Sequence, residues 1–152
     1  MRRIGLLVFL AAVGAAAAVM PASAQSTQEF KAQFQDTPSA TCPAGVDSCG
    51  RGIVKGFGTA ATTLTFTDFV PGPGANCVTA MGVRVVTLES DGSTLVLSLT
   101  GTICNLAISG TFSIDSGTGV FDGAVGGGTI SGVAIRGKPS DSVHFSGTIT
   151  LP

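Results

Sequence analysis

Polar and apolar residues alternate with a period of two over most of the chain. Thr and Ser fill one side of the alternation, Leu, Ile, Val and Phe fill the other, and Gly-rich turns interrupt it. This pattern is typical of β-strands with one buried face. After the first 24 residues, no apolar repeat at helical spacing is long enough to predict a helix. The predicted strands span residues 29–35, 52–59, 62–69, 78–89, 94–99, 102–108, 111–114, 129–136 and 143–151.

The turn sequences support this order of strands. Ser90-Asp91-Gly92-Ser93 predicts a two-residue hairpin turn, because Asp-Gly tolerates the positive φ values of a type I′ turn. Pro71-Gly72-Pro73-Gly74 cannot donate hydrogen bonds to a β-ladder from its prolines, and it predicts a loop. The segment 36–50 contains two Pro and two Cys, and we expect it to be a loop held by a disulfide.

A short motif recurs along the chain: Gly-Thr-Ile or Gly-Thr-Phe starts at Gly101, Gly110, Gly128 and Gly147. We interpret each glycine as part of a turn and the following residues as the start of a strand. The intervals are unequal, which favours a meander of successive strands over a solenoid of fixed period. The predicted fold class is all-β, with a single antiparallel β-barrel of about eight strands. A two-sheet β-sandwich is the alternative, because both architectures hide sheet edges.

Residues 1–24 have the features of a secretory signal peptide. Arg2 and Arg3 precede an apolar run over residues 4–20, and Ala22-Ser23-Ala24 is a small-residue cleavage site. The run lies at the lower limit for a membrane-spanning helix, so we favour cleavage between Ala24 and Gln25 over a retained anchor. The sequence therefore predicts a barrel domain over residues 25–152. We expect it to be secreted, extracellular or in the cell envelope, and free of the membrane after cleavage.

Charge is sparse and nearly balanced. The 152 residues include 8 Lys+Arg and 9 Asp+Glu, so that 11% are charged, while 44% are hydrophobic. A nucleic-acid partner would need a basic surface that displaces phosphate counterions, and this composition excludes one. The apolar fraction is too high for a disordered chain.

All four cysteines follow the predicted leader, and an even number in an exported chain implies two disulfides. Of the three pairings, we favour Cys42–Cys49, which closes a small loop, and Cys77–Cys104, which joins two strand regions. A four-thiolate zinc site would require paired Cys-x2–4-Cys spacings, and neither gap fits. The sequence indicates no metal and no cofactor.

Arg84 is the candidate ligand-binding residue. On the predicted strand 78–89 it shares a face with Ala80, Val86 and Leu88. If that face lines the lumen, the guanidinium would lie among apolar walls. It could then fix an anionic or carbonyl group, because a buried cation without a partner is too costly. The opposite face is equally apolar, so a surface Arg84 that packs its stem on the barrel stays open.

No catalytic set is recognisable in the remaining residues. His144 falls on the polar, outer side of its strand, and no Gly-x-Ser-x-Gly elbow accompanies it. Asp68, Asp115 and Asp122 would form a paired-carboxylate site only if folding brought two of them into one cavity. The predicted aromatic core consists of Phe57, Phe66, Phe69, Phe112, Phe121 and Phe145.

One longer motif combines Gly110-Thr111-Phe112 with Ser116-Gly117-Thr118-Gly119-Val120-Phe121-Asp122-Gly123-Ala124-Val125-Gly126. It resembles the turn between strands in the allene oxide cyclase and dirigent barrel group, and the likeness extends over residues 101–137. The resemblance implies an eight-stranded antiparallel barrel, often dimeric or trimeric, with a largely apolar cavity and Phe121 as a cap. The catalytic acid and cavity Tyr of the enzymatic members have no counterpart, since this chain contains no Tyr.

The sequence thus favours an exported barrel that binds a small apolar molecule or serves as a non-catalytic extracellular module. It leaves enzymatic activity open. A barrel lyase or isomerase is one alternative, because a fitted cavity can promote ring closure with few polar groups. A self-assembling structural envelope protein is another, and a homo-oligomer is compatible with each.

Overall fold

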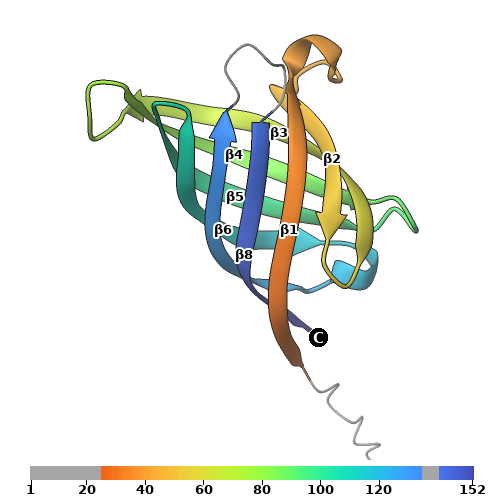
Figure 1. Cartoon of the computed structure of the whole chain (residues 1–152). Coiled ribbons are helices and arrows are strands. Elements are labelled where there is room, and N and C mark those ends of the chain that lie inside the picture. Colours follow the sequence, from red (N-terminus) through yellow and green to blue (C-terminus); the bar gives the residue numbers. More distant parts are fainter. Residues whose placement is uncertain (1–24, 135–140) are drawn as a thin grey trace, which may run out of the picture.

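Eight strands form one closed antiparallel barrel (Figure 1). The computed structural model describes residues 25–134 and 141–152, so the predicted leader, including Ala24, lies outside the described residues. Each strand pairs with the next, and β8 pairs with β1, which confirms the barrel over the sandwich. The strands are β1 (Ser26–Pro38), β2 (Ser48–Val54), β3 (Gly58–Pro71), β4 (Cys77–Leu88), β5 (Thr94–Cys104), β6 (Ala107–Gly117), β7 (Val125–Ala134) and β8 (Asp141–Leu151).

The described part also contains two short 3-10 helices, η1 (Ser39–Thr41) and η2 (Gly119–Phe121). Within residues 25–134 and 141–152, no helix is long and apolar enough to cross a membrane.

Two predicted strands were wrong because each crosses a tight turn. The segment 52–59 contains the turn between β2 and β3, where Gly56 has a φ of 85°. The segment 102–108 contains the turn between β5 and β6, formed by Asn105 and Leu106 with φ values of 47° and 76°. Phe57 and Leu106 are apolar, so neither turn is marked by an uninterrupted run of polar residues.

The loop between β4 and β5 is longer than the predicted two-residue turn. The Leu88 amide donates to the Ser93 carbonyl at 2.9 Å and closes a four-residue loop. Gly92 has a positive φ of 75°, whereas Asp91 does not, so the type I′ prediction was wrong. Asp91 instead accepts a hydrogen bond from the Ser93 amide at 2.9 Å, and its carboxylate holds the loop.

The recurring glycines lie within strands, not in turns as predicted. Gly101 in β5 is directly opposite Gly110 in β6, and Gly128 in β7 is opposite Gly147 in β8. A Cβ on Gly110 would lie 2.6 Å from the Gly101 Cα, and one on Gly128 would lie 2.6 Å from the Gly147 Cα. These pairs therefore permit a close approach of neighbouring strands that larger residues would prevent.

The hydrophobic core fills one half of the barrel. Rings from β1, β6 and β8 pack in series, with centroid distances of 5.5 Å for Phe30–Phe112 and 5.4 Å for Phe112–Phe145. Phe121 from η2 is fully buried and packs on Phe57 at 4.8 Å, which closes this end of the barrel. The cap expected from the sequence is therefore present, between Gly119 and Gly123 with positive φ.

Both disulfides have the favoured pairing and lie at the other end of the barrel. Cys42–Cys49 links the loop after β1 to β2, and Cys77–Cys104 links the start of β4 to the end of β5. The predicted 36–50 loop is shorter than expected, because Asp36 still belongs to β1 and Ser48 begins β2.

Replacement of the cap should destabilise the barrel. Phe121→Ala removes a fully buried ring, and we expect it to lower the free energy of unfolding by about 3–5 kcal/mol. The matched control is the neighbouring Val120→Ala, whose side chain is 48% exposed and whose loss should cost less than about 0.5 kcal/mol. Urea denaturation measures both values. Similar values for the two variants would contradict the assignment of Phe121 as the plug.

Candidate functional site

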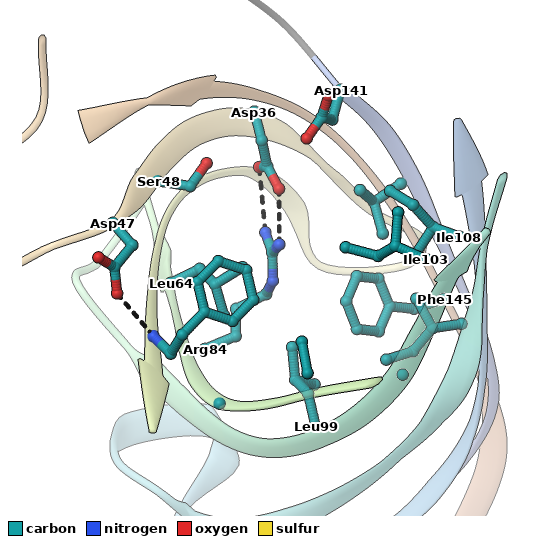
Figure 2. Close-up of a pocket in the computed structure, with 16 residues that line it drawn as sticks. Asp36, Asp47, Ser48, Leu64, Arg84, Leu99, Ile103, Ile108, Asp141 and Phe145 are labelled. Carbon is teal, nitrogen blue, oxygen red and sulfur yellow. Dashed lines mark hydrogen bonds and ion pairs between the residues drawn. The ribbon is translucent and has the colours of Figure 1, made fainter. Parts of the chain in front are cut away.

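The other half of the barrel contains a cavity of about 300 Å³, which opens where β1 leads into β2 (Figure 2). Its wall is mainly aliphatic and aromatic, with a few polar groups. The wall contains side chains or backbone of Leu64, Phe66, Ala80, Gly82, Leu99, Gly101, Ile103, Ile108, Ile130, Val143 and Phe145. The polar lining residues are Asp36, Asp47, Ser48, Arg84 and Asp141.

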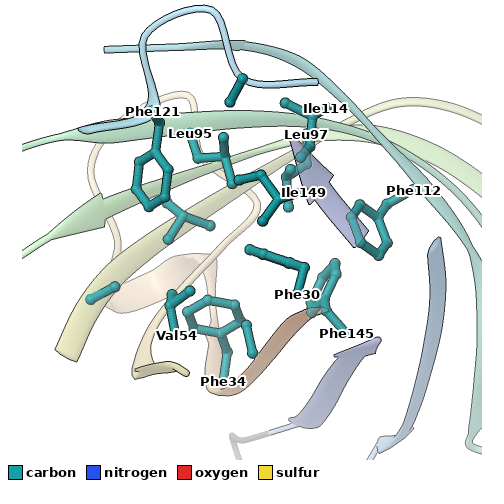
Figure 3. Close-up of a cluster of buried hydrophobic side chains, with 14 of the residues drawn as sticks. Phe30, Phe34, Val54, Leu95, Leu97, Phe112, Ile114, Phe121, Phe145 and Ile149 are labelled. Carbon is teal, nitrogen blue, oxygen red and sulfur yellow. The ribbon is translucent and has the colours of Figure 1, made fainter. Parts of the chain in front are cut away.

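Small residues at inward positions keep this half hollow. Ala80 and Gly82 alternate with outward residues on β4, and Gly101 lies opposite Ala80 on β5. The filled half places Phe and Leu side chains at the corresponding inward positions, and Figure 3 shows these side chains converging from several strands. The packed half thus forms the floor of the cavity.

Arg84 faces the lumen, which resolves the alternative that the sequence left open. Its side chain is 2% exposed and lies on the inward face of β4 together with Val86 and Leu88. Its two terminal nitrogens donate to the Asp36 carboxylate, with Nη1–Oδ1 at 3.1 Å and Nη2–Oδ2 at 2.6 Å. Asp36 is 3% exposed, so the lumen contains a buried bidentate ion pair between β4 and β1.

Further contacts surround the guanidinium. Nη1 also donates to the Thr62 hydroxyl at 3.2 Å. The Arg84 Cζ lies 5.5 Å from the ring centre of Phe34 and 5.4 Å from that of Phe145, within the range of cation–π attraction. The Arg84 Nε has no hydrogen-bond partner and is itself covered. Salt bridge, hydroxyl and rings together compensate much of the cost of a buried charge.

The absence of a side chain at Gly50 makes room for this ion pair. Gly50 on β2 is directly opposite Asp36 on β1 and Thr62 on β3. A Cβ at Gly50 would lie 2.7 Å from the Asp36 Oδ1 and 2.2 Å from the Gln35 carbonyl oxygen. Any larger residue would therefore move the carboxylate that Arg84 binds.

Polar groups at the opening attach the β1–β2 loop to the barrel. The Asp47 carboxylate accepts a hydrogen bond from the Phe66 amide at 2.7 Å. Ser48 Oγ donates to the Thr37 carbonyl at 2.9 Å. Asp141 on β8 is the direct strand partner of Asp36, and Figure 2 shows both carboxylates on the same side of the cavity. The rim is therefore polar, whereas the wall below it is apolar.

The other candidates from the sequence do not join this site. His144 is exposed on the outer face, as predicted, with its Nε2 3.5 Å from the Ser142 hydroxyl. Asp68, Asp115 and Asp122 are exposed and line no part of the cavity. In the described part of the chain, no group of three or more His, Cys, Asp or Glu could hold a metal ion.

Sequence reasoning missed Asp36, although a signal existed. The alternation Phe30, Ala32, Phe34 on the predicted strand 29–35 continues by one step to Asp36, which therefore faces inward. The prolines and cysteines that follow Asp36 predict a loop there instead. An inward acid on one strand and an inward Arg84 on another together predict an internal ion pair.

The ion pairs on the outer face are exposed to solvent, unlike the buried pair between Arg84 and Asp36. Lys31 and Lys55 contact the Glu29 carboxylate at 2.6 and 3.1 Å, and these hydrogen bonds lower the pKa of Glu29. Arg51 contacts Glu89 at 2.7 Å, with 79% of the Arg51 side chain exposed. Water screens such pairs, so they contribute little to stability.

Comparison with known proteins identifies no relative. No family model matches the chain, and neither a curated protein nor a solved structure matches it significantly. Its chemistry must therefore be inferred from the cavity. Asp36 and Arg84 bind each other, so neither is a free acid or base. The interior therefore presents a ligand with an apolar volume beside a charge-balanced ion pair.

Disruption of the internal ion pair should lower the free energy of unfolding far more than disruption of an ion pair on the outer face. Arg84→Met leaves Asp36 buried without its partner, and we expect a loss of about 3–5 kcal/mol in the free energy of unfolding. Arg84→Met combined with Asp36→Leu should recover part of that loss, because no buried charge remains.

The control is Arg51→Met, for which the expected loss is below about 1 kcal/mol. Chemical denaturation of all three variants gives the comparison. A double variant that is less stable than Arg84→Met alone would contradict this account of the pair.

Proposed function

We propose that this protein is an exported binding protein that holds a small apolar molecule in the hollow half of its barrel. The cavity of about 300 Å³ is the observation that carries the proposal. Its volume lies at the small end of the range for ligand pockets, and an apolar wall with a few polar groups is typical of such sites. Arg84 contributes as a fixed part of the cavity wall, held by Asp36.

Export is supported by the two disulfides and by the sequence of the leader. Disulfides persist in oxidising compartments and are rare in the cytosol. Both lie at the end of the barrel that carries the cavity. We propose secretion, or release into the cell envelope, after cleavage between Ala24 and Gln25.

The likeness to the allene oxide cyclase and dirigent barrel group also supports the binding proposal, because it implies a barrel with a largely apolar cavity. The closed eight-stranded barrel and the buried Phe121 agree with what that likeness implies. We propose that the chain is a small member of this group. An isomerase acting on an apolar substrate is the second candidate function, and the resemblance is what favours it. The mutual engagement of Arg84 and Asp36 favours binding over proton transfer.

Mass spectrometry of the protein from its own culture medium tests the export proposal. The intact mass should correspond to a chain that begins at Gln25, and reduction should add the four hydrogens of two disulfides. A mass that includes residues 1–24 would contradict cleavage.

Occupation of the cavity by a larger side chain should abolish binding. Ala80→Phe places a ring in the cavity, and Leu99→Phe enlarges another residue that lines it. Native mass spectrometry should show a noncovalent molecule on the wild-type protein that is lost on denaturation. Nile red should become fluorescent on the emptied protein, and both signals should be absent from the two variants.

Thr79→Phe, on the outward face of the same strand, is the matched control and should bind normally. Circular dichroism verifies that each variant is folded. Normal Nile red binding by folded Ala80→Phe and Leu99→Phe would refute the cavity as the site. Chemical conversion of the bound molecule over time would instead favour the isomerase.

A further inference from the structure

The apolar wall of the cavity continues onto the outside of the barrel. Hairpins β3–β4 and β5–β6 project together to the left of the barrel in Figure 1, and the Cys77–Cys104 disulfide joins them. Their inward faces are continuous with the cavity wall, and near the hairpin tips Val78, Ile103 and Leu106 are only partly buried.

Two phenylalanines form the first part of this outer surface. A β-bulge between Phe66 and Asp68 places Phe66 opposite Gly82 and Phe69 opposite Ala80. Gly82 and Ala80 both face the lumen, so both rings lie on the inward face of β3. Phe66 lines the cavity, whereas Phe69 is 54% exposed, with the ring centres 4.7 Å apart. Phe69, which we predicted to be in the core, is therefore an exposed extension of the wall.

A shallow groove forms the second part. Val78, Ile103 and Leu106 line it together with Cys77 and polar but uncharged residues. Ile103 also lines the cavity, so the groove and the cavity share a wall. An apolar surface thus leads from the interior across the opening and along the two hairpins.

The bottom of the cavity is suited to an apolar group. Arg84 and Asp36 bind each other and are only 2% and 3% exposed. The one guanidinium nitrogen without a partner, Nε, is covered. A polar ligand group inserted to this depth would find few free partners, and its burial would be unfavourable.

We propose that the ligand is an elongated apolar chain, such as an alkyl or isoprenoid chain, that inserts an apolar end into the cavity. The remainder of the chain lies against Phe69 and the groove beside Ile103, and any polar head stays near the polar rim. This inference rests on the proposed function and adds the shape and orientation of the ligand.

The test is displacement of Nile red by straight-chain alcohols from hexan-1-ol to tetradecan-1-ol. Affinity should rise about fourfold for each added methylene, as expected for burial of about 0.8 kcal/mol per methylene, and should continue to rise for the long members. Phe69→Ser should reduce the affinity of the long alcohols about tenfold and leave that of the short ones unchanged. Val125→Ser is the matched control, since Val125 is 56% exposed at the closed end of the barrel.

Diols with a hydroxyl at both ends test the orientation. Each diol should bind at least tenfold more weakly than the alcohol of equal length, because one hydroxyl must enter the apolar cavity. Equal affinity would refute insertion of an apolar end. If short alcohols bind but longer ones gain nothing and Phe69→Ser has no effect, the ligand is compact and this inference fails while the proposed function stands. If neither Nile red nor any alcohol binds, the proposed function itself fails.

Discussion

The buried ion pair between Arg84 and Asp36 is the constraint on which the cavity depends. It joins β4 to β1 through the lumen, and Gly50 on the intervening β2 provides the space that the Asp36 carboxylate needs. A charged pair removed from water does not by itself guarantee stability, because desolvation offsets much of the attraction. Its position in the barrel is clearer. On β4, Arg84 separates the cavity residues Ala80 and Gly82 from the core residues Val86 and Leu88, so the ion pair lies at the boundary between the cavity and the packed core.

The barrel therefore has two halves with different sources of stability. The closed half relies on interlocked rings and on the Phe121 plug. The open half lacks those contacts, and both disulfides occur there, where they restrict the chain without filling the interior. A barrel of eight strands is just wide enough to be filled by side chains or to hold one ligand. In this chain, side chains fill the barrel at one end, and the other end has space for a ligand.

The sequence predicted the fold more fully than the site. Period-two alternation and an even number of cysteines correctly indicated an all-β barrel with its disulfide pairing. Turn positions were less predictable, since the apolar residues Phe57 and Leu106 lie where the chain reverses. The site depended on whether Arg84 faces inward, and its strand is apolar on both faces, so local pattern could not decide. Only the register between distant strands brings Arg84, Thr62 and Asp36 together.

Closure of the barrel by its first and last strands also determines how it would respond to mechanical force. Ser26 and Leu151 are direct partners at one end of the β1–β8 ladder, and Asp36 and Asp141 are partners at the other. Antiparallel hydrogen bonds lie perpendicular to the strands. Tension that separates the two chain ends would therefore open this seam one pair at a time, like a zipper. Rupture would begin at the closed end and reach the cavity last.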